Sequence, residues 1–393
     1  NKMLPDKVSE QLKPLSVPGT EDVDEEASQE DYEYRLKGFI DSTMDKSAKN
    51  RLFALVGLKT AFSSKILYDL ILERRLTLTD SIERCLKKGK SEEQCAAAAV
   101  ASLLCIQLGS SIESEEVFKS LRSILKTIFT DESASIQTRK ANCFYCQQDL
   151  RLTMTYLESL FSALYWKEEQ PEWMQNNQTT MLHISALIAW TLLLTICPPS
   201  LVTQTLEKHM SKLPTLLSCG DVNMRIAAGE TMALLFELAR DICEDFDYED
   251  MELLCAQLKC LATDSNKYRA KTDRKKQRSV FRDVLRTVEK GDFDSETIAF
   301  GPERMYIDSW VKKRSYETFK EVLGSGIRLH LQANEFVRGL FELGPPPLLD
   351  AATLKATKIS RVERHYYNAA VCKARTKARN KSRDKRTDIG EYI

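Results

Sequence analysis

The sequence predicts an all-α protein, built as a HEAT/armadillo-like α-solenoid that ends in a basic C-terminal helix. Between residues 34 and 344, segments of about 12 to 20 residues carry apolar side chains at i, i+3, i+4 and i+7. Strand-like alternation is nearly absent from the same region. Two of the helical segments also resemble each other, and cations stand at every second position near the C-terminus. We therefore expect helical repeats followed by a charged helix.

The evidence for repeats is a gapless match between two apolar segments. Residues 91–108 (SEEQCAAAAVASLLCIQL) align with residues 221–238 (DVNMRIAAGETMALLFEL) at an offset of 130 residues, pairing Ala97 with Ala227 and Leu104 with Leu234. One third of that offset is about 43 residues, which lies within the period of HEAT and armadillo repeats. A generic match between two amphipathic helices is the alternative. Stacked repeats would offer a concave surface suited to a large partner.

Capping residues predict where the helices begin and end. Candidate starts are Asp45, Thr79, Ser91 and Asp221, each just before an apolar segment. Candidate stops are Gly89, Gly109, Gly291 and the pair Pro198 and Pro199.

The chain divides into three regions. Residues 1–31 are predicted to be a flexible acidic tail, because residues 1–34 hold ten acids and three bases and too little apolar surface to offset the entropy of ordering. Residues 32–344 form the helical repeat body. Residues 345–393 begin with three prolines, which remove backbone donors and end any helix, and continue as a basic helical extension.

Composition indicates a largely globular protein that needs neither metal nor cofactor. Eleven cysteines without framework spacing indicate a reducing compartment, and the Cys143 and Cys146 pair has no second ligand pair to complete a zinc site. The most apolar run, residues 182–197, is shorter than a membrane span and contains His183, so we expect a buried helix and no membrane. No secretory signal opens the chain. We expect a cytoplasmic protein with a possible nuclear pool.

An enzyme has little support in the sequence. Four histidines are available as bases, and His183 lies in an apolar segment where a core histidine is the simpler interpretation. Neither GxxxxGK[ST] nor GxGxxG occurs, so no loop is typical of phosphate binding. We expect no catalytic residue and no small-molecule substrate.

The strongest functional signal is the basic stretch of residues 371–386. In a helix, steps of two residues turn about 200° each, so its cations spread around the whole cylinder and leave no face to bury. In an extended form most of them would share one face. Either form favours an enclosing polyanion, while nuclear localisation is a simpler explanation that does not exclude it. The cations are Lys373, Arg375, Lys377, Arg379, Lys381, Arg383, Lys385 and Arg386.

Two further segments could contact RNA. Residues 267–290 hold ten bases and three acids along an amphipathic helix, which favours phosphate contacts over a merely solvated face. Residues 361–367 mix cations with aromatic side chains that could stack on unpaired bases, although one tyrosine could instead dock the helix onto the body. The candidates are Arg269, Lys271, Arg274, Lys275, Lys276, Arg278, Arg282, Arg361, Arg364, His365 and Tyr366.

Several stretches closely resemble the interferon-related developmental regulator family. They are LTLTDSIERCLKKGKSEEQ (76–94), DVNMRIAAGETMALLFELARD (221–241), ATDSNKYRAKTDRKKQRSVFRDVL (262–285), FGPERMYIDSWVKK (300–313) and KARTKAR (373–379). The likeness covers nearly everything from residue 32 onward, and residues 301–313 are more similar to the first member than to the second. The chain departs from the family pattern by being shorter between residues 143 and 150, and by Cys372 where relatives often have phenylalanine.

The resemblance implies a HEAT/armadillo solenoid and one of two non-enzymatic functions. Some members silence translation on idle 80S ribosomes, where the body occupies tRNA sites and the basic helix enters the mRNA channel. Others are described as nuclear co-regulators that join transcription factors to histone deacetylase co-repressor complexes. Because docking on a co-repressor usually needs an apolar face that residues 373–386 lack, the residues favour the ribosome and its RNA as partner.

Overall fold

Helices account for most of the residues that the structure describes. The computed structural model describes residues 23–142, 150–165, 177–264 and 270–347, together with Lys373 and Thr376. The first helices are α2 (Val23–Ser42), α3 (Ala48–Ser64), α4 (Tyr68–Glu73), α5 (Arg75–Lys88), α6 (Ser91–Leu108) and α7 (Ile112–Thr130). Because α2 begins at Val23, the expected boundary at residue 31 falls within a helix. Residues 1–22 of the predicted acidic tail lie outside the described residues.

The middle of the chain continues as packed helices. These are α8 (Ile136–Asn142), α9 (Leu150–Ser162), α10 (Asn177–Leu194), α11 (Pro199–His209), a 3₁₀ helix (Leu213–Ser218), α12 (Val222–Ile242), α13 (Met251–Thr263) and α14 (Lys271–Lys290). Helix α10 contains most of the apolar run at residues 182–197, and it is buried, as the sequence predicts. No helix among the described residues is long and apolar enough to cross a membrane.

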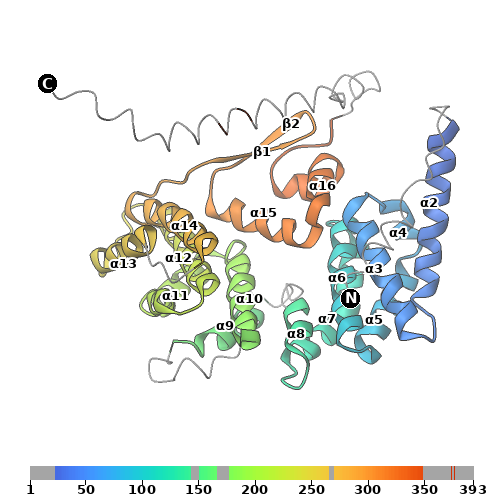
Figure 1. Cartoon of the computed structure of the whole chain (residues 1–393), viewed down its shortest axis with the longest axis horizontal. Helices are drawn as coiled ribbons and strands as arrows, with labels where there is room; N and C mark the ends of the chain where they lie inside the picture. Colours follow the sequence, from blue (N-terminus) through green and yellow to red (C-terminus); the bar gives the residue numbers. More distant parts are fainter. Residues whose placement is uncertain are drawn as a thin grey trace.

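The last described elements fold back between the earlier helices. They are β1 (Glu296–Phe300), β2 (Glu303–Ile307), α15 (Trp310–Leu323), a 3₁₀ turn (Gly324–Gly326), α16 (Ile327–Ala333) and α17 (Glu335–Leu340). Figure 1 shows α2–α7 on one side, α9–α14 on the other, and α15 and α16 between them.

The apolar side chains form two cores that share helix α15. The first core combines α2–α7 with the hairpin, α16 and α17, and includes Tyr316 and Leu323 of α15. The second core combines α9–α14 and includes Trp310, the first residue of α15. Helix α15 is thus packed into both halves of the molecule.

Buried polar contacts fix the start of α15 on α12. The carboxylate of Glu237 accepts hydrogen bonds from the amides of Trp310 (2.7 Å) and Val311 (3.1 Å). Burial raises the pKa of this carboxyl, while the two amide hydrogen bonds oppose the rise. The indole Nε1 of Trp310 donates to Thr287 Oγ1 of α14 at 2.8 Å. A carboxylate at a helix N-terminus is favourable because it satisfies orphan amides.

Several of the predicted helix ends are confirmed, but Ser47 and not Asp45 is the N-cap of α3, and Pro198 and Pro199 stand at the start of α11. Asp221 caps α12 by accepting from the amides of Asn223 and Met224, and α5, α6 and α14 end at the predicted glycines. Thr79 was expected to start a helix but lies inside α5, where its hydroxyl donates to the Arg75 carbonyl. The likeness between residues 91–108 and 221–238 corresponds to α6 and α12, which are both largely buried.

The expectation of a wholly helical body is corrected by the β1–β2 hairpin. The strands pair antiparallel with Phe300 opposite Glu303, and Gly301 takes a positive φ of 55° in the connecting turn. Phe300, Met305 and Ile307 are buried against the first core, whereas Tyr306 is exposed. Each strand has only five residues, and few of them are buried. The alternation of apolar and polar side chains is therefore too short to be recognised in a sequence dominated by helical segments.

Candidate nucleic-acid interface

Helix α14 presents a row of cations along one side. With 100° between successive residues, the row falls within an arc of about 120° and extends for about 22 Å along the helix. We call it the α14 cationic face, composed of Lys271, Arg274, Lys275, Arg278, Arg282 and Arg286. Four of these side chains are exposed, and Arg274 and Arg278 are half-buried.

The opposite side of α14 is apolar and packs against α12 and α13. Phe281, Val284 and Val288 are fully buried there in the second core. Phe281 lies against Gly229 of α12, where a Cβ atom would come within 2.7 Å of the phenyl ring. The glycine therefore allows α14 to approach closely, and the cations are directed outward because the apolar side is committed to the core.

Buried polar contacts hold both ends of α14. Near its start, Gln277 Oε1 accepts from Arg225 Nη2 at 2.6 Å, and Gln277 Nε2 donates to Asp264 Oδ2 at 3.1 Å. Near its end, Arg240 donates to the carbonyls of Thr287 and Val288. Cations at a helix C-terminus satisfy orphan carbonyls and favour the helix dipole. The face is thus carried on a rigidly supported helix.

Local acids neutralise only part of the α14 cationic face. Arg286 forms an ion pair with Asp294 at 3.2 Å, although both side chains are substantially exposed and the pair is screened by water. Asp283, half-buried beside the face, has a raised pKa because burial outweighs the attraction of Lys313, Arg286 and Arg282. Helices α13 and α14 have no exposed aromatic side chain. Within the described residues, the face can therefore contact phosphates but offers no aromatic side chain to stack on bases.

A second feature fixes the point where the C-terminal extension leaves the body. Arg338 of α17 is only 1 % exposed and makes a bidentate pair with Glu303 of β2, both distances being 2.9 Å. The same guanidinium donates to the carbonyls of Leu343, Gly344 and Pro345 at 2.8 to 3.2 Å. Residues 343–345 are thereby tied to the hairpin immediately before the basic extension begins.

The structure places some of the candidate residues and leaves others outside its description. Lys271, Lys275, Lys276 and Arg282 are exposed, and Lys276 donates to Asn223 of α12 at 3.3 Å, away from the cationic face. Lys373 is helical and exposed, as is Thr376. The rest lie outside the described residues: Arg269, Arg361, Arg364, His365, Tyr366, Arg375, Lys377, Arg379, Lys381, Arg383, Lys385 and Arg386.

The described ranges contain no candidate metal site. No group of three or more His, Cys, Asp or Glu residues within them could hold a metal ion. Cys143 and Cys146 are outside those ranges. Sequence reasoning did not identify Arg338 or Gln277, because an isolated arginine or glutamine in a helix gives no signal until tertiary packing surrounds it.

Comparison with known protein families agrees with the resemblance that the sequence shows. The sequence profile of the interferon-related developmental regulator (IFRD) family matches residues 6–289, and that of the interferon-related protein conserved region matches residues 334–387. The chain therefore belongs to the interferon-related developmental regulator family.

Similarity to individual relatives extends over almost the whole chain. It is 64 % identical over 385 residues to interferon-related developmental regulator 1 of Homo sapiens, covering 95 % of this chain and 85 % of the relative. It is 51 % identical over 381 residues to interferon-related developmental regulator 2 of Mus musculus, covering 94 % and 86 %. The greater likeness to the first member agrees with the resemblance at residues 301–313.

Proposed function

We propose that this protein is a non-enzymatic ribosome-binding factor that silences translation. Its body would occupy tRNA sites of idle 80S ribosomes, and its basic C-terminal helix would enter the mRNA channel. The body would be a HEAT/armadillo-like solenoid, with α6 and α12 as equivalent helices. The observation that carries the proposal is the α14 cationic face, a row of Lys and Arg on a helix that has no exposed aromatic side chain among the described residues.

The physical support for an RNA partner comes from two kinds of cationic surface. The α14 face has a fixed geometry and would position the body by contacting phosphates without reading sequence. The eight cations of residues 373–386 have no apolar neighbours to bury, and RNA walls on several sides would neutralise them. Arg338 would anchor the second surface to the body at a defined point.

Cosedimentation with purified 80S ribosomes, combined with in vitro translation, tests the proposal. Replacing Lys373, Arg375, Lys377, Arg379, Lys381, Arg383, Lys385 and Arg386 by Gln should release the protein and restore translation. The control replaces four exposed cations outside residues 271–286 and 373–386, Lys46, Lys49, Lys59 and Lys126, and should bind like the wild type. Undiminished binding of the C-terminal variant would count against insertion of the helix.

The alternative function is a nuclear scaffold that bridges transcription factors and a histone deacetylase co-repressor complex. It predicts contacts that tolerate salt and a body that suffices without the basic extension. Affinity purification from cells with and without ribonuclease separates the two functions. Recovery of ribosomal proteins that depends on RNA supports the ribosome, and recovery of nuclear proteins that survives ribonuclease supports the scaffold.

A further inference from the structure

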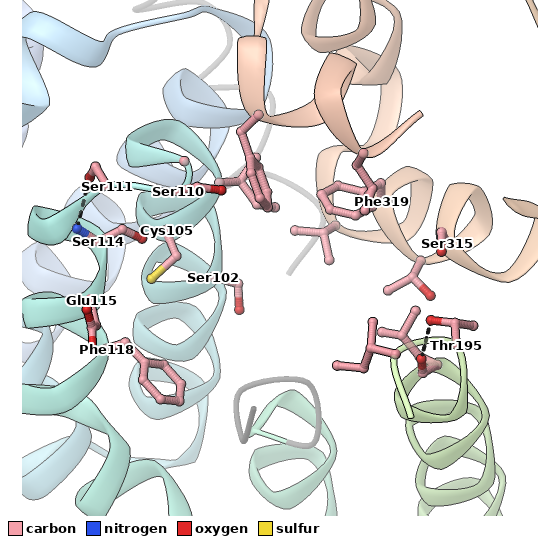
Figure 2. Close-up of a pocket in the computed structure, with 18 of the residues that line it drawn as sticks. Ser102, Cys105, Ser110, Ser111, Ser114, Glu115, Phe118, Thr195, Ser315 and Phe319 are labelled. Atoms are coloured by element: carbon pink, nitrogen blue, oxygen red, sulfur yellow. Dashed lines mark hydrogen bonds between the residues drawn. The ribbon is translucent and has the colours of Figure 1, made fainter. Parts of the chain in front are cut away.

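An apolar groove lies between the two halves of the molecule and is lined by none of the residues of the α14 cationic face. Its walls are α6 and α7 on one side and α10, α15 and α17 on the other. Figure 2 shows Cys105 and Phe118 on the first wall, facing Phe319 and Ser315 across the opening. The volume is about 670 Å³, within the range of pockets that hold ligands or the side chains of a partner.

The surface of the groove is mainly apolar, with serine and threonine hydroxyls among the apolar side chains. Phe118, Phe319 and Phe336 line the interior and are half-buried. At the rim, Ile112 is 74 % exposed, Ile196 is 52 % exposed and Leu340 is 43 % exposed. Three large exposed aliphatic side chains, from α7, from the turn after α10 and from α17, thus line one opening, and an exposed apolar patch of this kind indicates an interaction site.

Three of the hydroxyls that line the groove form hydrogen bonds with nearby backbone carbonyls. The hydroxyls of Ser102, Thr195 and Thr318 donate to the carbonyls of Ala98 (3.2 Å), Leu192 (2.7 Å) and Arg314 (2.9 Å). Because the walls are helices, they offer no strand edge for an extended peptide. A polypeptide bound here must satisfy its own backbone hydrogen bonds, as an α-helix does.

The charge of the groove limits which kinds of ligand it can bind. Among the described residues that line the groove, Glu115 carries the only charge. Its ion pair with Lys119, at 2.7 Å, joins two exposed side chains and is therefore weak. The negative C-terminal ends of α6 and α10 and the positive N-terminal end of α7 all reach the groove, so the helix dipoles favour neither sign of charge. The carboxylate of Glu115 therefore decides the sign: it opposes a nucleic acid and favours cations on the polar side of the occupant.

We propose that this groove binds an amphipathic α-helix of a partner protein, with apolar side chains at i, i+4 and i+7 in the groove and Lys or Arg beside Glu115. The spacing of those anchors, about 10 Å along a helix, lets them reach both walls of one groove. This interaction is separate from ribosome binding, because it uses other residues and another chemistry.

Fluorescence anisotropy of the full chain with synthetic helical peptides tests the inference. The probe is an alanine-based helix with leucines at i, i+4 and i+7 and flanking lysines, compared with versions carrying flanking glutamates or serines in place of the leucines. The lysine probe should bind, about two- to fivefold tighter than the glutamate probe, since one exposed ion pair contributes little. The serine probe should not bind. Equal binding of all three, or of none, overturns the proposal.

Matched variants locate the binding site. Replacing Ile112, Ile196 and Leu340 by Ser should weaken the lysine probe by at least about tenfold, because less apolar surface would be buried. Leu76→Ser, at a side chain that is 71 % exposed elsewhere, should leave binding unchanged. Glu115→Lys should reverse the preference for the lysine probe over the glutamate probe. Equal losses in the triple variant and in Leu76→Ser would show nonspecific adsorption and reject the groove.

Three further measurements distinguish a partner helix in the groove from a second copy of the chain or a nucleic acid. Alkylation of Cys105, which lines the groove, should slow when the lysine probe binds, as measured by mass spectrometry. Self-association in sedimentation equilibrium that Ile196→Ser abolishes would instead assign the groove to a second copy. Binding of a duplex RNA that the triple variant abolishes would assign it to nucleic acid. Either result contradicts the proposal of a partner helix.

Discussion

The α14 cationic face and the apolar groove are two surfaces built by opposite means. On α14, the apolar side is buried against α12 and α13, so the exposed side is left to Lys and Arg. In the groove, helices from both halves leave their apolar side chains facing an opening, and charge is nearly absent. The difference shows that one helical scaffold can present two chemistries, provided that different helices turn different sides outward.

The largest expected difference between the two surfaces is in how strongly salt weakens their binding affinity. If the six cations of the α14 face each neutralise a phosphate, affinity for RNA should fall by about a thousandfold between 50 and 200 mM salt. Affinity of the groove for the lysine probe should change by less than about fivefold, since burial of apolar surface depends little on salt. Equilibrium binding of both ligands to the full chain across a salt series measures the contrast. Equal salt dependence of the two affinities would contradict the assignment of RNA to the face and a peptide helix to the groove.

Arg338→Met tests the contact that ties residues 343–345 to the hairpin beside the groove. Arg338 ties the start of the basic extension to the hairpin, and its helix also supplies Phe336 and Leu340 to the groove. Loss of the guanidinium leaves Glu303 unpaired near the interior, so the free energy of unfolding in urea should fall by roughly 3 kcal/mol.

The control for Arg338→Met is Arg328→Met, at an exposed arginine of the neighbouring α16. It should change the free energy of unfolding by less than about 0.5 kcal/mol. Equal stability of Arg338→Met and the wild type would show that the Arg338 contacts do not hold the hairpin.

Gly229→Ala tests the close packing of α12 against α14, which carries the cationic face, and leaves the groove residues unchanged. A methyl group there would meet the ring of Phe281 at 2.7 Å, so we expect about 1 to 3 kcal/mol of destabilisation from overpacking. Chemical denaturation measures it. Adding Phe281→Leu should recover part of the loss, because the smaller side chain leaves room for the methyl group. If the two substitutions are additive, the close approach of α12 and α14 is not what positions the face.

Low pH should destabilise the packing behind the groove, because a buried histidine there would have to accept a proton. Buried His330 of α16 accepts a hydrogen bond at Nδ1 from Asn334 (3.2 Å) and donates from Nε2 to the Phe62 carbonyl (3.2 Å). Asn334 in turn donates to the carbonyl of Ile106, which lines the groove. Protonation of His330 at Nδ1 would place its N–H opposite the side-chain N–H of Asn334, so this hydrogen bond would be lost. Burial lowers the pKa of His330, and hydrogen bonds to the carbonyls of Phe62 and Ser63 oppose this.

The sign of the pH effect follows from that direction. Since the pKa of His330 is lower in the folded than in the unfolded chain, the folded state binds fewer protons below the unfolded pKa of about 6.5. Stability is therefore fully present above pH 6.5 and decreases as the pH falls toward the folded pKa, by about 1 kcal/mol per pH unit. Urea unfolding at pH 7.0 and 5.5 measures this, and His330→Gln should reduce the difference. An unchanged difference would assign the pH effect to other groups.

The sequence allowed the helices and the α14 face to be predicted because both depend on local periodicity. Residues 271–290 place apolar side chains on one side and cations on the other, so the exposed Lys and Arg follow once the helix forms. The basic extension was equally evident from composition, although the structure describes only Lys373 and Thr376 within it.

The features that the sequence did not reveal depend on contacts between distant residues. Arg338 acts through Glu303, 35 positions away, and through the carbonyls of residues 343–345. The groove joins residues near 105–118, 192–196 and 315–340, which come together only because α15 packs into both cores. Helical periodicity identifies which side of a helix is apolar, but it does not show which apolar side remains uncovered.

Crosslinking of the bound full chain to ribosomal RNA tests the central claim most directly. After ultraviolet irradiation of the complex with 80S ribosomes, mass spectrometry identifies each peptide that carries a nucleotide. We expect crosslinked nucleotides on residues 271–286 and on residues 373–386, and none on the walls of the groove. Crosslinks concentrated at the groove, or a complex without RNA crosslinks on either cationic segment, would contradict translational silencing by charge-driven occupancy of the ribosome.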